Sequence, residues 1–103
     1  MQLSVEQRDG VHVVHVGEAK LTYPVLSSFF AGVVEVVDGG ARRVELDLTA
    51  VTFIDSAAIG CLIDIHHLLK DRSGAVRLRG LQPRVATMLT MAGVDRVLDV
   101  AKS

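Results

Sequence analysis

The sequence predicts an α/β fold, a two-layer sandwich in which helices pack on one face of a mixed four- to five-stranded sheet. Its 103 residues are 50% hydrophobic, enough for one core, so we expect a single domain over residues 1–103. Along the chain, segments of alternating apolar and polar residues are followed by segments whose apolar residues recur at helical spacing. Strict alternation in the strands implies one polar sheet face, which leaves the other face for the helices.

A β-hairpin is predicted at the start of the chain. Residues 3–6 alternate between apolar and polar side chains, and Asp9-Gly10 then supplies the dipeptide that favours a type I′ turn. The returning strand covers residues 11–16, with apolar side chains on both faces apart from two histidines. Those histidines must point to opposite sides, because side chains alternate along a strand.

A helix is predicted next over residues 23–38, because Pro24 falls in its first turn and Gly39-Gly40 ends it. Its apolar stripe is broad, which indicates a core helix, and comprises Leu26, Phe29, Phe30, Val33, Val36 and Val37. The remaining predicted elements are a strand at 44–48, a helix from 55–56 to 73–74, a strand at 76–79, a helix over 84–92 and a short final strand or docked tail at 97–100.

Residues 44–78 form a predicted β-α-β unit, which should be right-handed with parallel strands. If its strands are neighbours, the acidic side chains of the first can pair with the arginines of the second across the open face, at roughly 0.2–1 kcal/mol per pair. The residues concerned are Glu45, Asp47, Arg77 and Arg79.

The composition excludes several classes of function. A net charge of −1 argues against a nucleic-acid binder, and neither common glycine-rich phosphate loop occurs in the sequence. The single cysteine, Cys61, rules out a disulfide framework and a cysteine-based zinc site, and it fits a reducing compartment. The N-terminus does not resemble a signal peptide, and polar residues break each apolar stretch before the ~20 residues of a membrane span. We therefore expect a cytoplasmic protein with no cofactor and no membrane insertion.

The histidines raise the question of a metal or catalytic site. His12 and His15 point opposite ways on a strand, and His66 and His67 lie about 100° apart on a helix, so neither pair suits one metal ion. His66 falls inside the apolar arc of its helix, where we expect a partly buried structural imidazole. Ser56 lies roughly 15 Å from these helical histidines, too far for nucleophilic catalysis. The sequence thus predicts neither a metal site nor an enzyme.

The junction at Asp55-Ser56 is the strongest candidate for a functional site. An apolar strand end, Phe53-Ile54, runs directly into a predicted helix at this point. Asp and Ser are preferred helix N-caps, so both residues have an ordinary structural role. The same geometry exposes a serine hydroxyl beside free backbone N–H groups and the positive end of the helix dipole, which suit a phosphate. A phosphoryl group adds about −1.5 to −2 charges, enough to disturb a partner docked there.

This junction, with Ile59-Gly60 and an apolar helix after it, resembles the phosphorylation loop of STAS domains, which include the bacterial anti-sigma factor antagonists. The hairpin ending in Gly17-Glu18 and the tail over 83–94 also fall in the family's order. The resemblance implies a regulatory module without catalysis, in which Ser56 is phosphorylated by a partner serine kinase that is also an anti-sigma factor. The unphosphorylated form binds that kinase and releases a sigma factor, and a phosphatase resets the switch. The kinase's ATP is the only nucleotide required.

Two features depart from the family pattern. The family loop usually reads Asp-Ser-Ser-Gly, whereas Ala57 and Ala58 stand here for the second serine and the glycine. Lys20 takes a place that is often acidic in the family, which inverts the charge expected near Ser56. These departures favour an alternative: a constitutive, non-phosphorylated STAS subunit that stabilises a signalling scaffold or a membrane-transport ATPase complex.

A partner-binding surface is expected around Ser56. Cys61 and Leu68 lie at the edge of the helix's apolar arc, so both should be partly exposed, as ordinary flank packing or as a small docking patch. The protein is expected to be a monomer or weak homodimer. The predicted partner-binding residues are Lys20, Asp55, Ser56, Ala57, Ala58, Ile59, Cys61 and Leu68.

Overall fold

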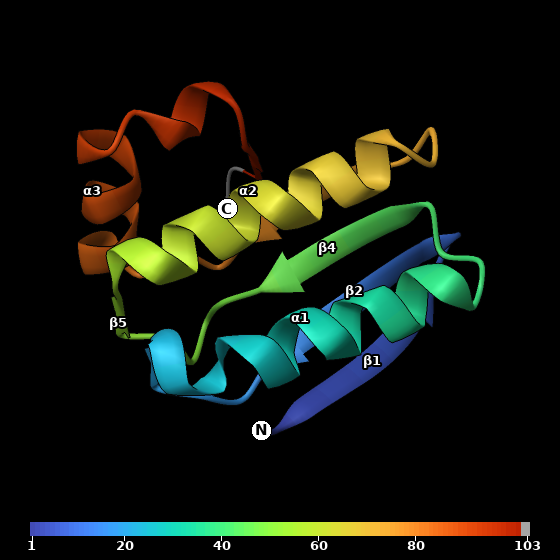
Figure 1. Ribbon diagram of the computed structural model, residues 1–103, viewed down its shortest axis with the longest axis horizontal. Coiled ribbons are helices and arrows are strands. Elements are labelled where there is room, and N and C mark those ends of the chain that lie inside the picture. The colour runs from blue at the N-terminus through green and yellow to red at the C-terminus, as the bar shows by residue number, and fades with distance from the viewer. Residues whose placement is uncertain (102–103) are drawn as a thin grey trace.

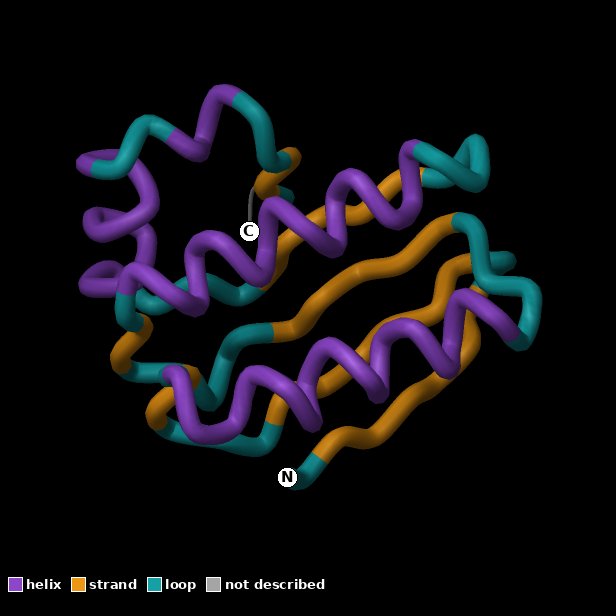
Figure 2. The backbone as a smooth tube through the Cα atoms, viewed as in Figure 1, coloured by secondary structure: helices purple, strands orange, loops and turns teal. Residues whose placement is uncertain are grey.

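The structure, a computed structural model, describes residues 1–101. Strands and helices follow one another much as the sequence predicts, and Figure 2 traces the backbone through them. In chain order the elements are β1 (Leu3–Arg8), β2 (Val11–Val16), β3 (Lys20–Leu21), α1 (Tyr23–Asp38), β4 (Arg43–Asp47), β5 (Phe53–Ile54), α2 (Ser56–Lys70), β6 (Ala75–Arg79), α3 (Pro83–Met91), the short 3₁₀ helix η1 (Val94–Arg96) and β7 (Asp99–Val100).

The main sheet has five strands in the order β1-β2-β4-β6-β7, and β3 pairs separately with β5. β1 runs antiparallel to β2, whereas the other neighbouring strands of the sheet are parallel. Figure 1 shows α1 and α2 side by side over one face of this sheet, while α3 stands at one end near β5. The predicted α/β sandwich with a mixed sheet is therefore confirmed.

The hairpin turns where the sequence predicts. Asp9 and Gly10 both adopt positive φ, 53° and 80°, as a type I′ turn requires. β1 then lies so close to α1 that a methyl group at Gly32 would collide with Cδ1 of Leu3. A glycine at this point therefore lets the helix approach the edge strand.

The core lies between the helices and the sheet. α1 directs Phe29, Val33 and Val37 into it, each fully buried, whereas Phe30 and Val36 of the predicted stripe are partly buried. β4, the residue that follows it and α2 add four fully buried side chains, Leu46, Leu48, Ile65 and Leu69. Because full burial of one such side chain contributes roughly 1.5–3 kcal/mol, this interface is the main source of stability.

The parallel strands β4 and β6 are neighbours, as predicted, and one ion pair forms between the predicted acidic residues and arginines. Nη1 of Arg79 lies 3.3 Å from Oε1 of Glu45, its diagonal neighbour. Arg77 instead binds Asp99 at 3.0 Å, because β7 brings a carboxylate alongside β6. Asp47 turns toward β2 and binds a histidine there.

The sequence pattern does not reveal two short elements, β3 and η1. They have two and three residues, too few for an alternating or helical period to be visible. β3 nevertheless decides the geometry of the site, because Lys20 and Leu21 pair in parallel with Phe53 and Ile54.

Candidate functional site

Asp55 joins the first turns of two helices. It lies in an extended conformation between β5 and α2, and its Oδ1 accepts a hydrogen bond of 2.8 Å from the Ala58 N–H, which caps α2. Its Oδ2 accepts a second hydrogen bond, of 2.9 Å, from the Tyr23 N–H at the start of α1. One carboxylate therefore satisfies a backbone donor at each helix N-terminus.

The β3–β5 pair explains why both helices begin at one place. Leu21 lies opposite Ile54, and both side chains are fully buried. α1 begins two residues after Leu21 and α2 begins two residues after Ile54, so their N-termini lie close together (Figure 1). The positive ends of two helix dipoles thus meet at Asp55.

Ser56 is the first residue of α2, and it is exposed. Two cations flank the strand that leads to it. Lys20 lies opposite Phe53, and the guanidinium of Arg84 stacks over the Phe53 ring, 5.3 Å from its centroid. The sequence does not indicate Arg84, because α3 reaches β5 only through tertiary packing. An exposed hydroxyl where two helix N-termini meet suits a phosphate group, and Lys20 and Arg84 add positive charge at Phe53, three residues earlier in the chain.

The predicted partner-binding residues lie at different depths. The exposed ones are Lys20, Ser56 and Ala57, and the partly buried ones are Asp55, Ile59 and Leu68. Ala58 is fully buried and Cys61 is 9% exposed. Ala58 therefore supports the surface from beneath, whereas Cys61, although largely buried, still lines a groove between α1 and α2.

The predicted partial exposure of Cys61 is wrong, whereas that of Leu68 is confirmed. α1 packs along α2, and the Cys61 side chain joins the buried core. Burial, with a smaller contribution from the Asp64 carboxylate, raises the pKa of Cys61 to about 11. The thiol is consequently protonated at neutral pH, the unreactive form of a cysteine.

A shallow groove starts at Ala57, next to Ser56, and runs between the N-terminal parts of α1 and α2, with a volume of about 500 Å³. Its α1 side includes Pro24 and Phe30, and its α2 side includes Ala57 and Gly60. Tyr23, which is 76% exposed, also lines it. The sequence does not indicate this contribution of α1, since it follows from the shared attachment of both helices to Asp55.

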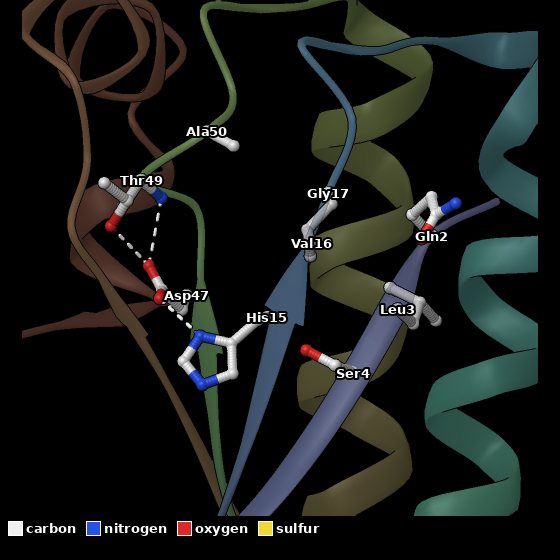
Figure 3. Close-up of a pocket in the computed structure, with 9 residues that line it drawn as sticks. All are labelled: Gln2, Leu3, Ser4, His15, Val16, Gly17, Asp47, Thr49 and Ala50. Atoms are coloured by element: carbon white, nitrogen blue, oxygen red, sulfur yellow. Dashed lines mark hydrogen bonds and ion pairs between the residues drawn. The ribbon is translucent and has the colours of Figure 1, made fainter.

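The opposite, open face of the sheet carries a charged cluster centred on His15 (Figure 3). Nδ1 of His15 lies 2.6 Å from Oδ2 of Asp47, and Nε2 lies 2.7 Å from Oε1 of Glu6. Hydrogen bonds to Glu6 and then Asp47 raise the pKa of His15. Burial acts to raise the pKa of Asp47, but hydrogen bonds from Thr49 and His15 outweigh it and leave that pKa lowered. The cluster is thus an imidazole held between two carboxylates, which favour its protonated form.

Ser4 lies on the same face, beside a cavity of about 330 Å³ that His15 and Asp47 also line (Figure 3). Serine, histidine and aspartate are the residue types of a hydrolase triad. Here, however, Nε2 of His15, the nitrogen that would face the serine in such a triad, is engaged by Glu6 at 2.7 Å. The arrangement links β1, β2 and β4 across the open face of the sheet.

Within residues 1–101, the structure contains no group of three or more His, Cys, Asp or Glu side chains arranged to hold a metal ion. His66 is partly buried, as the sequence predicts, and its ring meets that of His67 edge-on, with centroids 5.5 Å apart. Over the same described range, none of the helices has both the length and the apolar character needed to cross a membrane.

The sheet order, the helix pair over one face and the serine at the start of α2 define a class of protein. The STAS domain family model matches residues 2–103, so the chain belongs to the STAS domain family. This confirms the resemblance carried by the residues around Ser56. No curated protein matches the chain in sequence.

Solved structures similar to this chain include anti-sigma factor antagonists. One from Mycobacterium paratuberculosis has a TM-score of 0.86 at 22% identity, with 99% of this chain and 86% of that chain covered. A variant of Moorella thermoacetica RsbS has a TM-score of 0.79 at 24% identity, covering 100% and 88%. Bacillus SpoIIAA in its phosphorylated form has a TM-score of 0.70 at 15% identity, covering 99% and 93%. At such identities the likeness shows a common fold.

Proposed function

We propose that this chain is an anti-sigma factor antagonist-like regulator. It binds a partner serine kinase that is also an anti-sigma factor, and phosphorylation of Ser56 switches that binding. The observation that carries the proposal is the position of Ser56, an exposed hydroxyl where the N-termini of α1 and α2 meet. The similarity to SpoIIAA, whose structure exists in unphosphorylated and phosphorylated forms, supports it.

Phosphorylation would change the charge of this surface more than its fold. A phosphoryl group adds about −1.5 to −2 charges beside Asp55, in a chain whose net charge is −1. Free N–H groups of α2 and the cations Lys20 and Arg84 offset part of that charge within the folded protein. A partner docked over Ser56 would meet the remainder directly, so the switch acts on binding.

The docking surface of the proposed regulator combines the start of α2 with the groove beside it. Its exposed contacts would be Lys20, Ser56, Ala57 and Tyr23, with Ile59 and Leu68 at the margin. A phosphatase would remove the phosphate, and the kinase would supply ATP. The chain itself needs no cofactor and carries out no catalysis in this scheme, which takes place in the cytoplasm.

Intact-mass measurement tests the proposal. The chain is incubated with the serine-kinase anti-sigma factor encoded in its own genome and with Mg-ATP. We expect one phosphoryl group on the wild type and on Ser27→Ala, which alters another exposed serine, one that lines the groove between α1 and α2. We expect none on Ser56→Ala. A phosphorylated Ser56→Ala variant, or an unmodified wild type, would contradict the assignment.

The alternative function is a constitutive STAS subunit that stabilises a signalling scaffold or a membrane-transport ATPase complex. Ala58 favours it, because its buried side chain and the Asp55 cap hold the first turn of α2 in a regular helix without the family's glycine. A pull-down of the partner separates the two functions. The regulator loses its partner in Ser56→Asp and keeps it in Ser56→Ala, whereas the constitutive subunit keeps it in both.

A further inference from the structure

β1 forms one edge of the main sheet, and its outer side pairs with no strand among residues 1–101. Figure 2 shows it as the outermost long strand, beside α1. The opposite edge, β7, has only two residues, whereas β1 has six. A long edge strand presents a row of unpaired N–H and C=O groups, which is a template for pairing with another strand.

The hydrogen bonds of the hairpin show which β1 residues face outward. The Gly17 N–H donates to the Gln2 carbonyl at 2.8 Å, so the backbone of Gln2 faces β2. Antiparallel pairing alternates between bonded and non-bonded pairs, so Leu3, Val5 and Gln7 direct their N–H and C=O groups away from β2.

An apolar strip accompanies this edge on the helix side of the sheet. Val5 is 46% exposed and Met1 is 42% exposed, although the cross-strand partner of Val5, Val14, is fully buried. A cavity of about 670 Å³ between β1 and α1 continues the strip past Leu3 to Val36. α1 therefore leaves the outer margin of the apolar face uncovered.

We propose that this edge binds a second copy of the chain, with the two β1 strands antiparallel and Val5 on the two-fold axis. In that register Val5 faces Val5, and Leu3 of each copy faces Gln7 of the other. All three outward-facing residues then pair, which yields about six intermolecular hydrogen bonds. The two apolar strips become continuous, because Val5 and Leu3 lie on the same side of the sheet.

Charge and pairing length disfavour the two registers that are shifted toward the hairpin turn. Centring the pair on Glu6 places two like charges directly opposite each other, which is destabilising. Centring it on Gln7 places Val5 opposite Asp9, which lies in the turn with positive φ, and so shortens the pairing. With Val5 at the centre, Glu6 faces a serine hydroxyl, that of Ser4, and Arg8 faces the amide of Gln2. Glu6, which is already paired with Arg8 and His15 of its own copy, then faces no like charge.

The first test compares two half-exposed valines. Val5→Lys places two ammonium groups at the two-fold axis, whereas Val97→Lys alters a valine that is 48% exposed at the end of η1. Sedimentation equilibrium should show a concentration-dependent dimer for the wild type and Val97→Lys, and dimerisation weakened at least about tenfold for Val5→Lys. Circular dichroism checks that each variant is folded.

A wild type that stays monomeric up to millimolar concentration overturns the proposal. An extended segment of another protein would then be the remaining candidate for pairing with β1. Equal loss of the dimer in both lysine variants, or in neither, also overturns it.

The second test fixes the register with a cross-linker. Val5→Cys should place its two thiols about 5.5 Å apart in Cα distance across the axis, and a short bifunctional thiol reagent should join the copies. Gln7→Cys should place them roughly 14 Å apart, beyond such a reagent. The native Cys61 is buried and does not compete. Cross-linking of Gln7→Cys in preference to Val5→Cys overturns the Val5-centred pairing.

Discussion

Two carboxylates, Asp55 and Asp47, each join separate elements of this protein, but they do so with different partners. Asp55 accepts hydrogen bonds from two backbone N–H groups, at 2.8 and 2.9 Å, and these donors do not titrate. Asp47 binds the imidazole of His15, whose second nitrogen binds Glu6. The helix junction is therefore sensitive to added charge, whereas the sheet cluster is sensitive to pH. Substitutions at the helix junction and at His15 therefore test the response to charge and the response to pH separately.

The largest effect is expected from Asp55→Ala, which removes the cap of α2 and the contact to α1 together. We expect the free energy of unfolding to fall by about 2–3 kcal/mol, measured by urea denaturation. Asp64→Ala, at an exposed aspartate within α2, is the matched control and should change it by less than about 0.5 kcal/mol. Equal effects of the two substitutions would mean that the shared carboxylate does not organise the helix ends.

A smaller effect is expected from Ala58→Gly, which loosens the same junction. The variant loses a buried methyl group and gains backbone freedom, so stability should fall by about 1.5–2 kcal/mol. Ala57→Gly next to it alters an exposed alanine in the same turn and should cost about 0.5–1 kcal/mol. If the two glycine variants unfold at the same urea concentration, the packing assigned to Ala58 is wrong.

Ser56→Asp should alter stability by less than about 1 kcal/mol. A negative charge gains from the N-terminus of α2, at about 0.3–1 kcal/mol, but it is repelled by Asp55. Thermal unfolding of the variant and of the wild type under the same conditions measures this change in stability. A large destabilisation would mean that a negative charge at Ser56 acts by unfolding the protein, which contradicts the proposed effect on partner docking.

The pH response of the His15 cluster is expected to be the smallest effect, because the His15 side chain is 35% exposed and water screens both ion pairs. The pKa of His15 is raised in the folded state, chiefly by Glu6 and then by Asp47. The stability it contributes is therefore fully present below about pH 6.5 and is lost as pH rises through the raised value.

Urea denaturation at a series of pH values, starting below about 6.5 and rising, should show the stability of the wild type decline. His67→Gln, which alters an exposed histidine of α2, should show the same decline. His15→Gln should remove it. A decline that survives in His15→Gln would assign the titration to another group.

Local patterns in the sequence predict most of the fold. Pro24 and Gly39 bracket α1 correctly, and Asp9-Gly10 marks the hairpin turn. The capping role of Asp55 also follows from its residue type and place. These features depend on residues that are close in the chain, which is why a single sequence contains them.

Long-range contacts account for what the sequence did not predict. The Tyr23–Asp55 bond joins residues 32 positions apart, and it depends on the two-residue pair of β3 with β5. His15 and Asp47 meet only through the register of β2 and β4. Cys61 is buried because α1 covers that side of α2. The helical period of α2 alone does not show which neighbouring element will pack against its flank.

The two-residue pairing of β3 with β5 has a consequence for how an enzyme could recognise Ser56. The surface around this serine is assembled from segments more than thirty positions apart, so no linear peptide reproduces it. A kinase that reads this surface reads a three-dimensional epitope, and a synthetic peptide of residues 50–62 would lack α1, Tyr23 and Lys20. Under the proposed function, the chain must therefore fold before Ser56 can be phosphorylated, and misfolded chains would take no part in the signalling.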